Sequence, residues 1–80
     1  HNVSMTASFV LYTREHCHLC DQAARLLDSL RVSYREVDID EDAGLEARYG
    51  LKVPVLAQPA KCREICYPFA EEAVRSFVAQ

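Results

Sequence analysis

The feature that most restricts the fold of this chain is a pair of cysteines between an apolar run and a helical pattern. The run from Phe9 to Thr13 is rich in aromatic and branched residues, which predicts a short buried strand. After Cys17 and Cys20, apolar residues recur at helical spacing and predict a helix over about 18–30. The residues of this apolar stripe are Ala23, Leu26, Leu27 and Leu30. The cysteines therefore lie where a strand passes into a helix.

A junction of this kind favours thiolate chemistry. The unpaired N–H groups and the macrodipole at a helix N-terminus stabilise negative charge. Such a place lowers the pKa of a thiol, and the thiolate is the reactive form of cysteine. Cys17 and Cys20 are three positions apart, so they can meet across one helical turn as a dithiol or a disulfide. We therefore predict a redox site and a lowered pKa for Cys17.

Two other interpretations of the cysteine pair stay open. A Cys-x-x-Cys pair can be half of a zinc site, which would normally include a second pair at similar spacing. The only other cysteines are Cys62 and Cys66, which have three residues between them rather than two. The cysteines could also be purely structural.

Size and charge exclude several classes of function. Eighty residues form one domain of modest stability, without room for an enclosed cofactor cavity. The formal charge of -3 gives no electrostatic reason to bind nucleic acid. No apolar run approaches the roughly 20 residues that span a bilayer, and no signal sequence is recognisable. We expect a cytoplasmic monomer without nucleic-acid or membrane partners, in a compartment where paired cysteines are more often catalytic than structural.

The first residues are set apart from this interpretation. Residues 1–4 precede Met5, so we interpret them as an expression remnant. The single domain is then expected over 5–80.

The middle of the chain predicts a parallel pair of strands. Residues 34–39 read as a second strand, and its connection to the first contains a helix, as in a right-handed βαβ unit. The acidic run Asp40-Glu41-Asp42 could suggest a metal site, but Asp40 or Asp42 as N-cap of a short helix over about 43–49 is the simpler interpretation. Gly50 is expected to end that helix in a left-handed conformation.

The last third predicts a hairpin and a helix. Pro54 suits the start of a strand, and its bond to Val53 can be cis. A turn over 58–61 leads to an antiparallel strand over 63–67. Pro68 is expected to open the last helix, with Glu71 and Glu72 in its first turn. Its apolar face comprises Phe69, Ala73, Val74, Phe77 and Val78. The predicted fold is α/β, in the order βαβ-α-ββ-α, with one mixed four-stranded sheet and three helices.

These segments resemble the glutaredoxin branch of the thioredoxin-fold superfamily. The resemblance runs from Phe9 to Val78, through Leu11-Tyr12-Thr13-Arg14, Cys17-x-x-Cys20 and Tyr49-Gly50-Leu51-Lys52-Val53-Pro54. The ending Tyr67-Pro68-Phe69, with the acidic run, resembles a small, largely uncharacterised group of glutaredoxin-like proteins.

The resemblance implies a role for each matching residue. Cys17 is the expected nucleophile and Cys20 the resolving cysteine. Pro54 is the expected cis-proline that packs against them, and the backbone of Val53 is expected to pair with an extended substrate. Arg14 matches a basic position that contacts the carboxylate of glutathione; the alternative is an exposed loop charge.

The implied activity is thiol–disulfide exchange with protein or small disulfides. No metal and no bound cofactor are expected, and glutathione is a candidate reductant. The chain departs from the family where Lys52 replaces a threonine and where Cys66-Tyr67-Pro68-Phe69 replaces a Gly-Gly-x-Asp that holds glutathione. A strictly glutathione-dependent reductase, a metal-binding module and a non-catalytic interaction module of the same fold stay open as alternatives.

Two histidines and two further cysteines complete the candidate residues. His16 and His18 could favour the Cys17 thiolate when protonated, or could be surface residues without a role. In an extended strand, Cys62 and Cys66 would have Cα atoms about 13 Å apart, too far for a disulfide. We expect two ordinary thiols, one of them buried; an auxiliary role for Cys66 near the substrate groove is the alternative.

Overall fold

The apolar run and the helical pattern around the two cysteines fold as a strand and a helix. The computed structural model describes residues 8–80, so the expected remnant at 1–4 lies outside the described residues. The strands are β1 (Phe9–Thr13), β2 (Tyr34–Asp38), β3 (Val55–Gln58) and β4 (Arg63–Cys66). The helices are α1 (His18–Ser29), α2 (Ala43–Tyr49) and α3 (Glu71–Ala79), and two 3-10 turns are η2 (Ile39–Glu41) and η3 (Pro59–Lys61).

The four strands form one mixed sheet in the order β2-β1-β3-β4. β1 and β2 are parallel because α1 carries the chain back between them. β3 is antiparallel to both β1 and β4. The predicted mixed sheet with three helices is thus confirmed.

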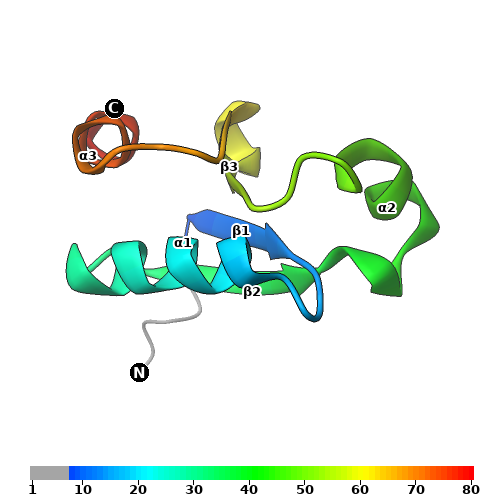
Figure 1. Cartoon of the computed structure of the whole chain (residues 1–80). Helices are drawn as coiled ribbons and strands as arrows, with labels where there is room; N and C mark the ends of the chain where they lie inside the picture. Colours follow the sequence, from blue (N-terminus) through cyan, green and yellow to red (C-terminus); the bar gives the residue numbers. More distant parts are fainter. Residues whose placement is uncertain (1–7) are drawn as a thin grey trace, which may run out of the picture.

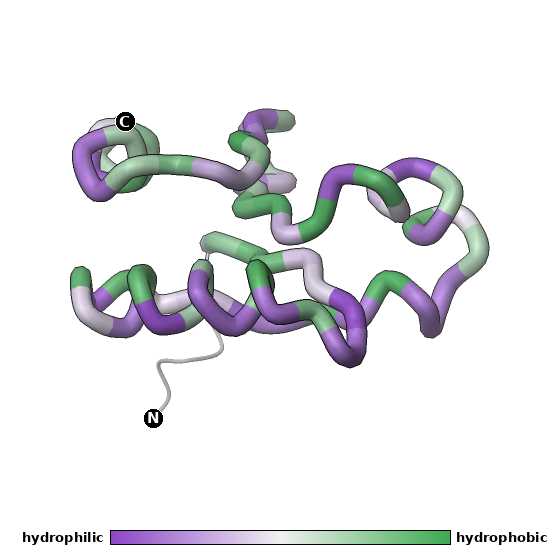
Figure 2. Tube along the Cα trace, in the orientation of Figure 1, coloured by the Kyte–Doolittle hydropathy of each residue, from purple (hydrophilic) through white to green (hydrophobic). Residues whose placement is uncertain are grey.

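The main core lies between the sheet and two of the helices. Figure 1 shows α1 and α3 alongside the sheet, while α2 lies beyond the ends of β1 and β2 to which their arrows point. The core residues come from β1, α1, β3, the segment before α3, and α3 itself: Leu11, Ala23, Leu27, Leu56, Phe69, Val74 and Phe77. The residues predicted for the apolar stripes of α1 and α3 supply this core or pack against it, except Ala73, which is exposed. Figure 2 shows polar and apolar residues alternating along both helices.

A second, smaller cluster anchors α2. Ile39, Tyr49 and Val55 are buried together, and Tyr12 stacks on Tyr49 with ring centroids 4.5 Å apart. Side chains alternate along a strand, so Tyr12 and its pairing partner Val55 share a face, and the neighbouring pair Leu11 and Leu56 faces the main core. The short helix α2 is thereby fixed to the sheet next to the end of β1.

The end of α2 differs from the expectation for Gly50. Gly50 lies in the right-handed helical region, with φ -53° and ψ -35°, so the predicted left-handed cap is wrong. Instead, the N–H groups of Lys52 and Val53 both return to the carbonyl of Tyr49, at 2.8 and 3.1 Å. Glycine is needed here for space, because a Cβ at position 50 would meet the carbonyl oxygen of Glu46 at 2.6 Å.

One further expectation for the end of the chain is wrong. α3 begins at Glu71 after the N-cap Ala70, so Pro68 lies outside the helix, although Glu71 and Glu72 are in its first turn as predicted. Phe69 is buried in the main core, and this requires the chain to cross from β4 to α3 before the helix can start.

Cys62 and Cys66 are both exposed free cysteines, so the expectation that one of them is buried is also wrong. Cys62 ends η3 in a left-handed conformation, φ 53°, outside the strand. Cys66 is an outward residue of β4, which pairs on one side only.

Of the helices in the described part of the chain, none has the length and apolar character needed to cross a membrane.

Candidate redox site

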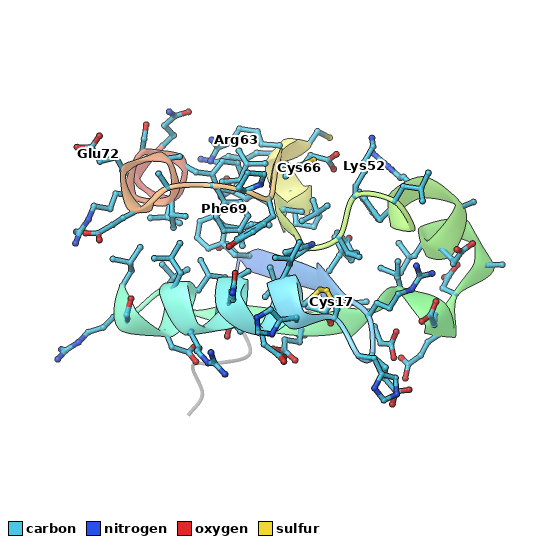
Figure 3. All side chains as sticks on the ribbon, in the orientation of Figure 1. Cys17, Lys52, Arg63, Cys66, Phe69 and Glu72 are labelled. Atoms are coloured by element: carbon cyan, nitrogen blue, oxygen red, sulfur yellow. A yellow bond between two sulfur atoms is a disulfide. The ribbon has the colours of Figure 1, made fainter. Side chains whose placement is uncertain are left out.

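The two cysteines of the Cys-x-x-Cys pair meet as a disulfide at the start of α1. Cys17 is the N-cap residue, in extended conformation, and Cys20 lies in the first helical turn. Their Cα atoms are 5.2 Å apart, and Figure 3 shows their sulfur–sulfur bond at the end of α1 that the loop from β1 reaches. Cys20 is buried, whereas Cys17 is half-buried. Cys17 is therefore the more accessible cysteine of the pair.

The helix start presents a hydrogen-bond donor to this sulfur. The backbone N–H of Cys20 donates to Sγ of Cys17 at 3.1 Å. A donor in this place, together with the helix dipole, stabilises a thiolate more than a thiol. The local sequence produces the arrangement, because a cysteine at the N-cap takes the position that serine or aspartate usually occupies.

The loop between β1 and α1 holds two of the other candidate residues. His16 is exposed and has a left-handed backbone, φ 59°, a conformation that glycine adopts more easily. The exposed His18 ring has Nε2 3.2 Å from Nε2 of Gln22, one turn further along α1. In the described part of the chain, neither the His16 nor the His18 ring is hydrogen-bonded to the disulfide.

Arg14, the first residue after β1, is hydrogen-bonded in three directions. It donates to the carboxylate of Asp40 through Nε and through a terminal nitrogen, at 3.2 and 2.8 Å. The same terminal nitrogen lies 2.9 Å from Oε2 of Glu46, and the other one donates to the carbonyl of Gly50 at 3.1 Å. The hydrogen bonds from Arg14 lower the pKa of Asp40 below its ordinary value.

The pairing of Arg14 was not predicted from the sequence. Its partners are 26 to 36 positions away in the chain. The acidic run drew attention to Asp40 as a possible cap, but the cap of α2 is Asp42, whose carboxylate accepts from the N–H of Gly44 at 2.7 Å. No local pattern could have assigned Asp40 and Glu46 to Arg14.

Val53 and Pro54 lie at the same end of the sheet as the disulfide. The pairing of β1 with β3 includes Tyr12 and Val55, so the next residues, Thr13 and Pro54, adjoin at the edge from which the loop to Cys17 departs. The peptide bond between Val53 and Pro54 is cis, Pro54 is fully buried, and Val53 is half-buried.

Tyr67 spans the space between β3 and α1. Its backbone N–H donates to the carbonyl of Pro54 at 3.0 Å, and its phenol donates to Oε1 of Gln22 at 3.0 Å. Its ring lies edge-on to Phe69, with centroids 5.3 Å apart. Tyr67, which lies where the family has Gly-Gly-x-Asp, thus connects Pro54 to α1 through hydrogen bonds. Gln22 and Tyr67 were not identified from the sequence as site residues.

A cleft of about 500 Å³ opens beside the disulfide, between the loop and β2. Cys17 and Cys20 both line it. Its charged lining comprises the carboxylates of Glu15, Asp21, Glu36, Asp38 and Glu41, and the arginines Arg14 and Arg35. The charge of Arg14 is already offset by Asp40 and Glu46, so the surroundings of the disulfide are acidic.

The remaining cysteines are not part of this site. Figure 3 shows Cys66 on β4 and Cys17 at the start of α1, and neither Cys62 nor Cys66 lines the cleft beside the disulfide. Among residues 8–80, no three His, Cys, Asp or Glu side chains converge as a possible ligand set for a metal ion.

Comparisons with known proteins agree with this geometry. A family model described as a glutaredoxin-like domain (DUF836) matches residues 8–78. The X-ray structure of the structural genomics target XcR50 from X. campestris shares 44% identity and has a TM-score of 0.81; the match covers 89% of this chain and 95% of that one. No curated protein matches the chain.

Two further structures show how far the likeness extends. The solution structure of Ne2328 from Nitrosomonas europaea shares 28% identity with a TM-score of 0.75, and the match covers 88% of each chain. The holo form of glutaredoxin C1 from populus tremula x tremuloides shares 20% identity with a TM-score of 0.57, over 95% of this chain and 78% of that one. At this low identity, glutaredoxin C1 is evidence for the fold alone.

Proposed function

This chain belongs to the glutaredoxin-like domain family (DUF836), and on that premise we propose that it is a thiol–disulfide oxidoreductase acting on protein or small disulfides. The observation that supports the proposal most is the disulfide between Cys17 and Cys20 at the start of α1. The half-buried Cys17 accepts a backbone hydrogen bond, while Cys20 is buried behind it. This asymmetry suits one cysteine that attacks a partner and one that resolves the product.

The reaction is a two-step exchange. In the reduced protein, the Cys17 thiolate attacks one sulfur of a substrate disulfide; a sulfur–sulfur bond forms to Cys17, and the other half of the substrate leaves as a thiolate. Cys20 then loses its proton and attacks the Cys17 sulfur, which releases the second half as a thiolate. Two electrons pass to the substrate, the two released thiolates take up protons, and the protein is left with the Cys17–Cys20 disulfide. A thiol reductant, for which glutathione is a candidate, then reduces this disulfide and regenerates the dithiol.

The substrate is proposed to lie along Val53. Val53 adjoins the buried Pro54 at the edge of β3, where the backbone is close to the loop that leads to Cys17. An extended segment with a cysteine could pair with this backbone while its sulfur faces Cys17. The sequence-based assignment of Arg14 as a contact for a glutathione carboxylate stays a prediction, and so do the monomeric state and the cytoplasmic location.

Mass spectrometry of the protein across a range of thiol redox buffers tests this function. The loss of two hydrogens should appear reversibly in the wild type and be absent from Cys17→Ser. The Cys20→Ser variant should accumulate a mixed disulfide on Cys17, because the second step is blocked. The Cys62→Ser variant is the matched control, since it removes an exposed thiol outside the site. A wild-type protein whose cysteines stay unmodified in every buffer would exclude the proposed reaction.

A further inference from the structure

The guanidinium of Arg14 joins the two loops that flank the disulfide. One loop, 14–16, runs from β1 to Cys17, and Arg14 opens it. The other, 50–54, runs from α2 to β3 and contains Val53 and Pro54. The bond from Arg14 to the carbonyl of Gly50, at 3.1 Å, connects them directly.

The anchor points of this connection are themselves fixed. Asp40 lies in η2 and Glu46 in α2, and both carboxylates are within 3 Å of the same terminal nitrogen of Arg14. Charge-assisted hydrogen bonds to a planar guanidinium fix direction as well as distance. With the Gly50 carbonyl as the third acceptor, the side chain of Arg14 is held at three points.

Gly50 couples this cluster to the backbone of the second loop. A Cβ there would meet the Glu46 carbonyl oxygen at 2.6 Å and Oε2 of Glu46 at 2.8 Å, and Oε2 is the oxygen that accepts from Arg14. The turn continues with the bond from the Val53 N–H to the carbonyl of Tyr49, at 3.1 Å. A displacement of Arg14 or of Glu46 would therefore reach Val53 through the backbone of Gly50 and the peptide group that joins it to Tyr49.

We propose that Arg14 is a positioning residue, which holds the Val53–Pro54 backbone in place relative to Cys17 by binding Asp40, Glu46 and the Gly50 carbonyl. The expected effect on KM rests on the proposed thiol–disulfide reaction, whereas the positioning of the loop by Arg14 does not. It assigns Arg14 to the protein's own loops rather than to a substrate carboxylate. Within the described chain, every side-chain hydrogen bond of Arg14 goes to one of these three acceptors.

The first test compares two substrates with the variants Arg14→Lys and Arg14→Met. The probe is a tripeptide with a central cysteine, dimerised through a disulfide, made once as the free acid and once as the C-terminal amide. Misplacement of the Val53 backbone should raise KM about ten- to a hundredfold for both forms, with kcat nearly unchanged. The lysine variant should show part of this rise in KM, because one ammonium cannot reach all three acceptors. A rise in KM confined to the free-acid peptide would overturn the proposal and support direct contact with a substrate carboxylate.

One control and one second variant separate positioning from general damage. Arg75→Met removes an arginine from a comparable ion pair with Glu71, on α3, and should leave both KM values unchanged. Gly50→Ala keeps Arg14 but displaces Glu46, so it should raise KM for both forms as Arg14→Met does.

Amide hydrogen exchange gives a readout that needs no activity. The Val53 amide should exchange faster in Arg14→Met, while the amide of Leu56 inside β3 should keep its protection. Unchanged exchange at Val53 would overturn the proposal. If the wild type reduces neither peptide, the proposed thiol–disulfide reaction is wrong. The rate of hydrogen exchange at the Val53 amide then decides alone whether Arg14 positions this loop.

Discussion

The two glycines of this chain lie in or next to the same helix, and alanine should affect them in opposite directions. Both have ordinary right-handed or extended backbones, because no glycine of the described chain has positive φ. In such a place, a glycine-to-alanine change stabilises a protein by about 0.4–1 kcal/mol through the unfolded chain. The outcome then depends on the space that the new methyl group finds.

At Gly44 the methyl group meets only a side-chain oxygen. Its nearest neighbour is Oδ1 of the exposed Asp42, at 3.2 Å. This oxygen caps α2, and a shift of a few tenths of an ångström would leave its 2.7 Å bond from the Gly44 N–H within hydrogen-bond distance. We expect Gly44→Ala to raise the free energy of unfolding by up to about 1 kcal/mol.

At Gly50 the methyl group meets backbone. The Glu46 carbonyl oxygen would lie 2.6 Å away, and this oxygen already accepts from the Gly50 N–H at 2.8 Å. Relief of such a contact requires a backbone shift, and overpacking of this kind costs about 1–3 kcal/mol, more than the entropic gain. We expect Gly50→Ala to lower the free energy of unfolding by about 1 kcal/mol, with a fall of about 4–8 °C in Tm.

Urea unfolding of the wild type and the two variants measures both effects, with the slope against denaturant as a check that all three unfold alike. Equal stabilisation by the two alanines would refute the argument from space. In that case Gly50 would be an ordinary helical glycine.

Three further predictions concern the cap of α2, Tyr49 and the acidic cleft. Asp42→Ala removes the side-chain acceptor for the N–H groups of Gly44 and Leu45 and should cost about 1 kcal/mol in urea unfolding; no change would mean that water caps α2 equally well. Burial, and next a hydrogen bond to Glu64, raise the pKa of Tyr49 to about 12, so stability from this group is complete below pH 10 and is lost as pH rises toward 12. Tyr49→Phe should flatten that alkaline decline, and an unaltered curve would contradict the assignment. The acidic cleft should favour disulfide peptides with lysine beside the cysteine over the same peptides with glutamate, and salt should reduce the preference. Glu36→Gln should weaken it while Glu72→Gln, on α3 and away from Cys17 in Figure 3, should not; equal rates for both peptides would refute the electrostatic argument.

The order of elements and the position of the cysteine pair could be predicted because they depend on local patterns. The apolar run of β1, the stripe of α1 and the cap at Asp42 each require only residues within a few positions of one another. The parallel pairing of β1 and β2 also follows from the chain order, since a helix lies between them. Cys17 at the N-cap and Cys20 in the first turn are consequences of the same local geometry.

The surroundings of the cysteine pair depend on contacts between distant segments, so only the tertiary structure decided them. Arg14 was identified as a charged residue near Cys17, but its partners come from η2, α2 and the turn after α2. The role of Gly50 depends on the carbonyl and carboxylate of Glu46 rather than on its own φ. Tyr67 reaches Gln22 across 45 positions. A pattern in the sequence determines which face of a helix is apolar, but the acceptor of a particular guanidinium or phenol is determined by how the packed elements meet.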